Sequence, residues 1–178
     1  MNCSVRMLRL HDLERTADHL EAHMAESGRD GDAIFTPQEH FDRERFMARR
    51  EQWWIAPVGD GDWERAWGVF QHDALVGHLD LAGEGIPGQG HRARLGMGLV
   101  RAARRQGHGT RLMRAAIDWA REQPGLAWID LGVFGDNLGA QHLYERFEFQ
   151  RIGVKRDRFR VQGQSIDDIE MTLRLNGR

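Results

Sequence analysis

The sequence predicts a single domain of the α/β (α+β) class, with a mixed, mostly antiparallel sheet flanked by helices. Its 178 residues, 40% of them hydrophobic and 29% charged, suit one compact core. Near the middle, a strand, a glycine-rich loop, a helix and a second strand follow one another, and such a crossover joins parallel strands. The patterns on either side read as hairpins, which surround the parallel pair with antiparallel strands.

The first elements are a strand and an amphipathic helix. Alternation predicts the strand over Val5–Leu10. From about Asp12, apolar residues recur at helical spacing and share one face, namely Leu13, Ala17, Leu20 and Met24. Gly28 is expected to end this helix.

A second helix is expected to begin shortly afterwards. Thr36 supplies a capping hydroxyl, Pro37 suits the first helical position, and Glu39 places a carboxylate three residues after the cap. The helix is expected to run to about Arg50. The shape of Gln52–Arg65, which contains a tryptophan pair, a proline and a glycine-aspartate run, stays open.

The next two strands, Ala66–Gln71 and Ala74–Leu81, are expected to form a hairpin that turns at His72 and Asp73. One face of the second strand carries Leu75, Leu79 and Leu81, and the other carries Val76, His78 and Asp80. Gly83–Gly90 is expected to be a loop.

The central crossover unit begins with a strand over Arg92–Val100. Gly96 and Gly98 leave one face of this strand bare, opposite Ala93, Leu95, Met97 and Leu99. A bare strand face invites a ligand or another backbone. The helix that follows ends before Pro124 and Gly125, and its apolar stripe consists of Leu112, Met113, Ala116, Ile117 and Ala120.

The remaining elements are a strand, a helix and a closing hairpin. The strand covers Leu126–Phe134, and apolar residues at helical spacing predict a helix near Leu138–Phe147. Two closing strands, Arg151–Val161 and Ser165–Leu175, are expected to turn at Gly163.

The loop between the central strand and its helix, Arg104–Thr110, reads RRQGHGT and is an expected anion cradle. The first turn of a helix leaves backbone N–H groups unpaired at the positive end of the helix dipole, where phosphate binds. Gly107 and Gly109 let the backbone close on a pyrophosphate, and Arg104 and Arg105 can add forked, charged donors. Seven arginines and no acidic residue lie between positions 92 and 114, which concentrates positive charge here.

Charge and composition limit the partners of the chain. A net charge of −2 argues against general attraction to nucleic acid or to membranes. Cys3 is the only cysteine, so an intrachain disulfide and a cysteine-rich metal site are excluded, and it is expected to be an isolated terminal thiol. His19 and His23, four residues apart without an evident third ligand, are expected to be solvated rather than metal-binding. No signal peptide or membrane span is recognisable, so a cytoplasmic location is expected.

Several other catalytic and nucleotide-binding motifs do not fit the sequence. It contains no G-K-[ST] of a nucleotide-hydrolysing loop and no G-x-S-x-G nucleophile elbow. Gly83, Gly85 and Gly88 match a dinucleotide fingerprint in letters, but Pro87 interrupts it and a strand follows. A generic phosphate or nucleotide binder remains one alternative.

The stretch from Leu95 to Phe149 resembles the GNAT superfamily of acyl-CoA-dependent N-acyltransferases. The superfamily pattern R/Q-x-x-G-x-G/A falls on Arg104, Gly107 and Gly109, between a strand and an amphipathic helix. The segment Val100–Ala103 lacks the common His-Pro-x-Tyr wording, and this departure leaves the phosphate loop unchanged.

A second motif, similar to the N-x-x-A-x-x-L-Y-E-x-x-G-F signature of the superfamily, consists of Asn137, Ala140, Leu143, Tyr144, Glu145 and Phe149. Phe147 stands where glycine is usual. This departure is expected to change the end of a helix rather than the reaction, because a C-cap tolerates other residues at some energetic cost.

The resemblance implies acetyl-CoA as cosubstrate, and a sheet whose two central parallel strands splay apart to admit the pantetheine arm. It implies that backbone groups of Met97, Gly98 and Leu99 pair with pantetheine, and the bare faces at Gly96 and Gly98 agree with this. The residues implied around the pyrophosphate are Arg105, Gln106, Gly107, His108, Gly109 and Thr110. Asn137 would bond the pantetheine or cap the second helix, and both roles stay open.

Tyr144 is the only tyrosine in the chain. The resemblance places it where a phenol protonates the departing CoA thiolate, a role that needs a proton donor in a site poor in water. A helical aromatic residue that only fills the core is the alternative.

The attacking amine must lose a proton before it reacts. A lysine-like amine with a pKa of ~10.4 costs ~4.6 kcal/mol to deprotonate at pH 7, so it needs a base or a water chain. The base candidates are His78 and Asp80 on one strand face, and Glu84 and His91 in the adjoining loop. A cluster of Trp53, Trp54 and Trp63 with Asp60, Asp62 and Glu64 either receives a cationic amine or forms a tryptophan-filled rim beside a solvated acidic turn.

These observations predict an acetyl-CoA-dependent N-acetyltransferase that works by direct transfer in a ternary complex, without a metal. The acceptor is expected to be a small-molecule amine or a protein N-terminus. The alternative from another class is a catalytically inactive module that binds and senses acyl-CoA. Many members of the superfamily pair, so the closing hairpin is a candidate homodimer interface.

Overall fold

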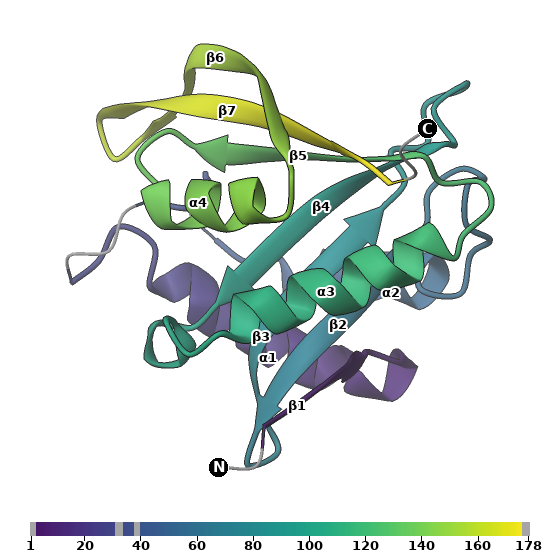
Figure 1. Cartoon of the computed structure of the whole chain (residues 1–178). Coiled ribbons are helices and arrows are strands. Elements are labelled where there is room, and N and C mark those ends of the chain that lie inside the picture. The colour runs from purple at the N-terminus through teal and green to yellow at the C-terminus, as the bar shows by residue number, and fades with distance from the viewer. Residues whose placement is uncertain (1–2, 31–33, 38–39, 176–178) are drawn as a thin grey trace.

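The computed structural model describes residues 3–30, 34–37 and 40–175, and their strands form one seven-stranded sheet in the order β1-β2-β3-β4-β5-β7-β6. Neighbouring strands are antiparallel except β4 and β5, which are parallel. The mixed, mostly antiparallel sheet predicted from the sequence is therefore confirmed (Figure 1). The strands are β1 (Cys3–Met7), β2 (Glu64–Gln71), β3 (Ala74–Ala82), β4 (Arg92–Leu99), β5 (Trp128–Phe134), β6 (Gln150–Val161) and β7 (Gln164–Arg174).

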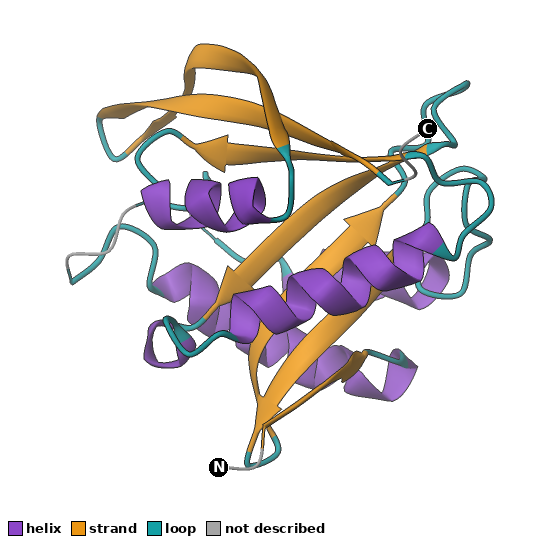
Figure 2. Cartoon of the chain, in the orientation of Figure 1, coloured by secondary structure: helices purple, strands orange, loops and turns teal. Residues whose placement is uncertain are grey.

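Helices cover both faces of the sheet (Figure 2). The described helices are α1 (Leu13–Ala25), α2 (Arg43–Trp53), α3 (His108–Arg121) and α4 (Leu138–Arg146), with two 3-10 turns at Leu10–Asp12 and Arg101–Ala103. α3 lies on one face, and α1 and α2 lie on the other (Figure 1). None of these helices is both long enough and apolar enough to cross a membrane.

The two faces bury separate apolar clusters because each helix turns its hydrophobic stripe toward the sheet. The larger cluster joins the α3 stripe to the odd-numbered side chains of β3, β4 and β5, including Leu79, Leu95 and Leu131. The smaller cluster packs Leu13 and Ala17 of α1 with Phe46 and Trp54 of α2 on the opposite face. The predicted stripe of α3 is confirmed, and of the α1 stripe Leu13, Ala17 and Leu20 pack in the cluster whereas Met24 does not.

The hairpin between β2 and β3 follows the prediction. His72 and Asp73 form its turn with φ values of 47° and 67°, the left-handed pair that two-residue hairpins require. Trp67 pairs with Leu79 on the face toward α3, and Ala66 pairs with Asp80 on the face toward α1 and α2.

Several boundaries differ from the prediction, and two of the differences have a local cause. β1 ends at Met7 instead of Leu10, because the Asp12 carboxylate accepts the Arg9 backbone N–H at 2.9 Å and starts a 3-10 turn there. α2 begins at Arg43 instead of Pro37: Asp42 caps it by accepting the Arg45 N–H at 3.0 Å. Glu39, the third member of the predicted helix start, lies outside the described residues.

The segment whose shape the sequence left open contains the end of α2, a turn and the start of β2. Trp54 and Trp63 are buried, whereas Asp60 and Asp62 are exposed. Glu64 does not belong to a solvated turn: it is 3% exposed and its carboxylate accepts from the indole of Trp54 at 2.8 Å and from Arg50 at 3.2 Å. These contacts fasten α2 to the sheet.

Candidate active site

The parallel strands β4 and β5 separate after a short paired stretch. Only Arg92, Ala93 and Arg94 of β4 pair with β5, opposite Trp128, Ile129 and Asp130. Beyond this point β4 stays paired with β3 as far as Leu99, and β5 stays paired with β7 as far as Phe134. The two strands therefore diverge from a vertex, and α4 lies across the opening (Figure 1). The splayed parallel pair is confirmed.

A cavity of about 710 Å³ fills this opening, a volume typical of small-molecule sites. Its walls are residues 95–99 of β4, residues 132–134 of β5, the loop before α3 with the first turn of that helix, and one side of α4 along its length. The described lining contains Arg104, Arg105, Arg146, His23 and His108 but no carboxylate, so the cavity suits an anionic ligand.

The predicted anion loop forms one end of the cavity. Gly107 is the N-cap of α3 with φ of 78°, a left-handed conformation that glycine adopts without a steric penalty. Arg105 is also left-handed, with φ of 58°. Gly109 has a different reason to be glycine, because a Cβ there would lie 3.0 Å from the Leu143 side chain of α4. The loop thus turns sharply and directs the start of α3 at the cavity.

Most of the predicted loop residues line this cavity. They are Arg104, Arg105, Gly107, His108, Gly109 and Thr110. Gln106 does not line it: its side chain donates to the Ala102 carbonyl at 2.8 Å and accepts from Gln71 at 3.0 Å. Arg146, the last residue of α4, donates to the Thr110 hydroxyl in the first turn of α3 at 3.1 Å and so links the end of α4 to the start of α3.

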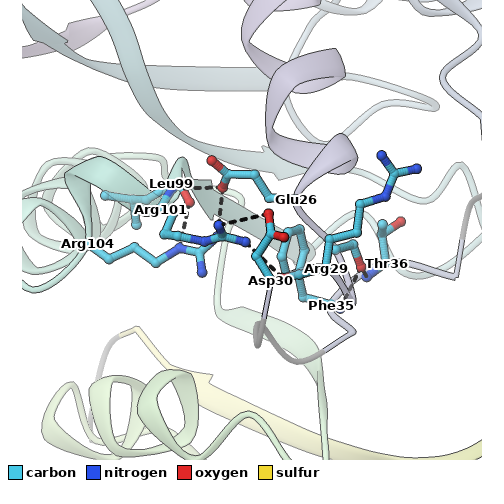
Figure 3. Close-up of polar contacts among 9 residues, drawn as sticks. Glu26, Arg29, Asp30, Phe35, Thr36, Leu99, Arg101 and Arg104 are labelled. Atoms are coloured by element: carbon cyan, nitrogen blue, oxygen red, sulfur yellow. Dashed lines mark hydrogen bonds and ion pairs between the residues drawn. The ribbon is translucent and has the colours of Figure 1, made fainter.

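The Arg104 guanidinium is committed to protein contacts, and this corrects the expectation of a forked phosphate donor. It donates to the Leu99 carbonyl at 3.0 Å and to the Glu26 carboxylate at 2.9 Å, as Figure 3 shows. Its carbon Cζ also lies 5.4 Å from the ring centre of Phe35. Arg104 therefore lines the cavity with a guanidinium that contacts within the protein already hold.

Arg101 joins the same contact between the end of α1 and the exit of β4 (Figure 3). Its backbone N–H donates to Glu26 at 2.7 Å, and its guanidinium contacts the Arg29 carbonyl at 2.8 Å and Asp30 at 3.3 Å. Of the seven arginines between positions 92 and 114, Arg101 and Arg104 therefore contact acidic residues that follow α1.

The segment after α1 closes one side of the cavity. Ser27 accepts the Phe35 N–H at 3.0 Å, and Phe35 stacks on His23 with ring centres 4.4 Å apart. Phe35 and His23 both line the cavity. Ile34 packs with Phe134, Val161 and Ile166, so the segment also contacts the β5, β6 and β7 side of the opening.

Met97, Gly98 and Leu99 line the cavity as expected, but the face at Gly96 and Gly98 is not bare. A Cβ on Gly96 would lie 2.9 Å from the Asp80 carboxylate, and one on Gly98 would lie 2.7 Å from the His78 ring. Asp80 and His78 are the register partners of these two glycines on β3. Gly96 makes room for Asp80 of β3, and Gly98 makes room for His78 of β3 and for His23 of α1, which a Cβ there would meet first.

Asp80, one of the four base candidates, lies against Gly96 of β4. Burial, together with the negative charge of Glu64, raises the pKa of Asp80 to about 7, and Arg50 opposes this effect. The charge of Asp80 in turn contributes to the raised pKa of Tyr144. A carboxylate that titrates near neutral pH therefore lies directly behind the cavity wall at Gly96.

His78 lies in a cluster of histidines. Its Nδ1 is 2.9 Å from Nε2 of His19, and the rings of His19 and His23 stack 6.0 Å apart. His19 is 4% exposed, so the expectation of two solvated histidines is wrong. Burial lowers the pKa of His78 well below its usual range and that of His19 to about 4. Among the described residues, no group of histidine, cysteine and acidic side chains is arranged to hold a metal ion.

The other two base candidates, Glu84 and His91, are not brought to the cavity. Both are exposed in the connection between β3 and β4, whereas the anion loop follows the opposite end of β4. Neither lines the cavity.

Tyr144 and Asn137 reach the cavity from α4. Tyr144 is 6% exposed and packs against Phe149, and burial is the main cause of its raised pKa. Asn137 caps α4, because its side-chain oxygen accepts the Ala140 N–H at 3.2 Å. Of its two open roles, the structure shows the cap. At the other end Phe147 has φ of −97°, and the left-handed conformation falls on Glu148 with φ of 67°.

Cys3 is less isolated than the sequence predicts. Its sulfur lies 3.6 Å from Nδ1 of His108, and Arg111 donates to it at 3.1 Å. Burial and the charge of Arg111 lower the pKa of His108. These partners lie more than one hundred positions along the chain, so no local pattern reveals them. Cys3 itself does not line the cavity.

Comparisons with known proteins agree with this architecture. A family model described as the Acetyltransferase (GNAT) family matches residues 29–149, more than half of the chain. The acetyltransferase of GNAT family from Streptococcus pneumoniae superposes with a TM-score of 0.81 at 16% identity, over 98% of this chain and 100% of that one. For yncA from Salmonella typhimurium, solved with its cofactor acetyl-CoA, the TM-score is 0.81 at 16% identity, over 99% and 95% of the two chains. The spermidine/spermine N-acetyltransferase SpeG from Vibrio cholerae gives 0.71 at 20% identity, over 97% and 94%. At these identities the superpositions show a shared fold.

Proposed function

The chain belongs to the GNAT family of acetyltransferases, and from this premise we propose that it transfers the acetyl group of acetyl-CoA to a primary amine. The acceptor is the amine of a small molecule or of a protein N-terminus. The observation that carries the proposal is the splay of β4 and β5, which leads from the glycine-capped start of α3 to a gap lined by Tyr144, with Asp80 behind the wall at Gly96. Membership in the family alone does not separate an enzyme from a sensing module, whereas this placement of an acid and a base supports catalysis.

The binding loop fits a pyrophosphate. Backbone N–H groups in the first turn of α3 have no partners within the helix and lie at its positive dipole end. Arg105 and Arg146, both exposed at the cavity, add positive charge. Unpaired backbone groups of residues 95–99 along the gap are positioned to hold a pantetheine arm by strand-like hydrogen bonds. Asn137 retains its amide NH₂ as a donor, since only its oxygen is used in the cap.

Acetyl-CoA supplies an activated thioester, and the residues of the chain manage two protons. Asp80 accepts the proton of the attacking amine as the carbon–nitrogen bond forms and the carbon–sulfur bond breaks. Tyr144 donates its phenolic proton to the departing sulfur. Return of the proton from Asp80 to Tyr144 restores both groups. No covalent enzyme intermediate is needed, and the described cavity lining contains no cysteine or serine.

Asp80 is preferred among the four base candidates for electrostatic reasons. A base with a pKa of about 7 is half ionised at neutral pH and still strong enough to take a proton. His78 has a pKa held well below its usual range by burial, so it is a weak base in this position. Glu84 and His91 lie at the other end of β4.

The test is thiol release from acetyl-CoA with a panel of primary amines, using the wild-type protein and Tyr144→Phe. We expect Tyr144→Phe to bind CoA as tightly as the wild type by calorimetry, because only a hydroxyl is removed, and to lose about 10²- to 10⁴-fold in kcat. Unchanged turnover would remove Tyr144 from the mechanism. CoA binding without thiol release from any amine would instead support the sensing module, and binding of ATP or NAD that CoA does not displace would support a generic nucleotide binder.

A further inference from the structure

Side chains from both faces of the sheet line the cavity, so it opens on each of them. Tyr144 of α4 reaches it from the face that carries the α3 stripe, because both belong to one apolar cluster. His23 of α1 and Phe35 of the segment after α1 also line it, and α1 lies on the opposite face (Figure 1). The start of α3, proposed to bind the pyrophosphate, belongs to the first face. The opening at His23 and Phe35 is therefore the side left for the acceptor.

Three rings from separate elements stand at this opening. Phe35 and His23 stack with ring centres 4.4 Å apart and an angle of 16° between their planes. His23 lies against the β4 arm of the gap, because a Cβ on Gly98 would be 2.4 Å from its Nε2. Phe134 ends β5 on the other arm, and its ring packs 5.3 Å from that of Phe159. All three rings line the cavity, so both arms of the gap present an aromatic wall.

The position of Phe35 is fixed before any acceptor binds. Its backbone N–H donates to the Ser27 hydroxyl at 3.0 Å, and the preceding residue, Ile34, packs with Phe134 across the gap. The guanidinium carbon of Arg104 lies 5.4 Å from the centre of its ring, and Figure 3 shows both side chains. A ring held in this way loses little freedom when a ligand packs on it.

Charged groups near these rings are already paired. Arg104, beside Phe35, forms an ion pair with Glu26 at 2.9 Å. On the β5 arm Asp168 lies behind Gly132 and pairs with Arg158 at 3.5 Å. A second ammonium group or a carboxylate on the acceptor would lose its hydration here without gaining a vacant counter-ion among these groups. The opening therefore suits an acceptor whose body is uncharged and apolar.

The group proposed to take the amine proton serves this same face. Leu79 and Leu81 of β3 pack toward α3, so strand alternation turns Asp80, which lies between them, to the face of α1. Its carboxylate stands behind the cavity wall at Gly96. One carboxylate suits one amine nitrogen, and the rings remain for the rest of the molecule.

Resting on the acetyltransferase function proposed above, we propose that the acceptor is a small primary amine with an aromatic body, that this body packs against Phe35, and that Phe35 is a specificity-determining residue for such amines. Flat rings pack on one another in offset or edge-to-face contacts, which aliphatic chains do not reproduce. A polyamine would bring a second cation among the rings, and a protein N-terminus would bring polar amides. The aromatic walls select against both.

The experiment compares phenylethylamine, benzylamine, n-propylamine, spermidine and alanine as acceptors in the thiol-release assay. We expect kcat/KM for phenylethylamine to exceed those for n-propylamine and spermidine about tenfold or more, the discrimination typical of a hydrophobic pocket. Phe35→Ala should lower kcat/KM for phenylethylamine about tenfold and change that for n-propylamine little. Phe35→Leu, which keeps apolar bulk without a ring, should lose less. Phe41→Ala is the matched control, because Phe41 is a partly buried phenylalanine that does not line the cavity, and it should leave the ratio of the two amines unchanged.

The outcomes separate this inference from the proposed function. Turnover of n-propylamine, spermidine or alanine at least as fast as of phenylethylamine would overturn the aromatic acceptor and leave the acetyltransferase intact. The same ratio of phenylethylamine to n-propylamine in Phe35→Ala as in the wild type would overturn the role of Phe35. Should Phe35→Ala fail to fold, the ratio in Phe35→Leu decides in its place. Failure of every amine would overturn the acetyltransferase function and this inference together.

Discussion

At the scale of single residues, Asp80 and Tyr144 have electrostatic surroundings that suit opposite tasks. Burial raises the pKa of both, with Glu64 adding to the effect on Asp80, and Asp80 adding to that on Tyr144. For Asp80 the result is a carboxyl group that exchanges its proton near pH 7. For Tyr144 the result is a phenol that keeps its proton throughout the usual working range. In the proposed mechanism this pair would supply one base and one acid at the same pH.

The pH dependence of turnover follows from these two values. Below pH 7 Asp80 is protonated and does not accept the amine proton, so kcat/KM should rise about tenfold per pH unit and level off above a pKa of about 7. Tyr144 should cause no fall on the alkaline side, because its pKa is raised above that of an ordinary phenol. The measurement is kcat/KM from pH 5 to 9 with an amine of low pKa, so that the acceptor does not titrate in the same window.

Asp80→Asn supplies the control for this profile. We expect it to lower turnover about 10²-fold or more and to remove the rise near pH 7. If the rise persists in Asp80→Asn, the titrating group is another residue and the base assignment is wrong.

At the scale of elements, the end of α1 positions the binding loop. The Glu26 carboxylate receives the Arg101 backbone N–H and the Arg104 guanidinium, and the latter also holds the Leu99 carbonyl. These contacts fix the path of the chain between β4 and α3 before any ligand binds. A preorganised loop gives higher affinity because less ordering is required on binding.

Glu26→Gln is the corresponding prediction. The amide keeps the shape of the side chain but loses the charge, so the Arg104 contact weakens by about 1–2 kcal/mol and the loop is held less firmly. The expected result is a KM for acetyl-CoA raised several-fold, with kcat and the acceptor KM nearly unchanged. Glu51→Gln, an exposed glutamate on α2, is the matched control. A fall in kcat with an unaltered KM for acetyl-CoA would contradict the positioning role.

Local patterns in the sequence were sufficient for most elements and for the binding loop. The α3 stripe, the β2–β3 turn and the glycines of the loop depend on neighbours a few residues apart, and all were predicted. The start of α2 was predicted too early, because Thr36 and Pro37 carry the same capping signal that Asp42 uses. Contacts between distant residues have no such signal: Glu26 and Arg104 are 78 positions apart, and the sequence alone assigned that arginine to phosphate.

The choice of a base among the four candidates depends on contacts between strands that the sequence does not show. Alternation placed His78 and Asp80 on one strand face, but only the register with β4 shows that they cover Gly98 and Gly96. Glu64 and Arg50, which act on the pKa of Asp80, come from elements whose shape or boundaries were uncertain in the sequence.

At the scale of the whole molecule, the sheet consists of two parts that share three residue pairs. β1 to β4 form one part and β5, β7 and β6 the other, joined at Arg92–Arg94 and Trp128–Asp130. Backbone groups of β4 and β5 beyond this join face the gap without a strand partner.

Hydrogen exchange should reveal this division. Amides of residues 95–99 that point into the gap should exchange faster than amides in the paired stretch at residues 92–94, and they should become protected when CoA binds. The measurement is amide exchange followed by mass spectrometry with and without CoA. Amides of β2, which is paired on both sides, provide the internal control and should not change. Equal protection of both stretches in the free protein would show that the strands are paired along their full length.

The join between the two parts of the sheet consists of only a few residue pairs, so a small change there affects the width of the whole gap. Hydrogen bonds among Arg92, Asp130 and Thr172 link β4, β5 and β7 where the two parallel strands begin to diverge. The groups proposed to react lie farther along the diverging strands. A small rotation at an apex becomes a larger displacement with distance from it. Substitutions of these three residues are therefore expected to change the width of the gap in which the thioester and the amine meet, although the three residues contact neither of them.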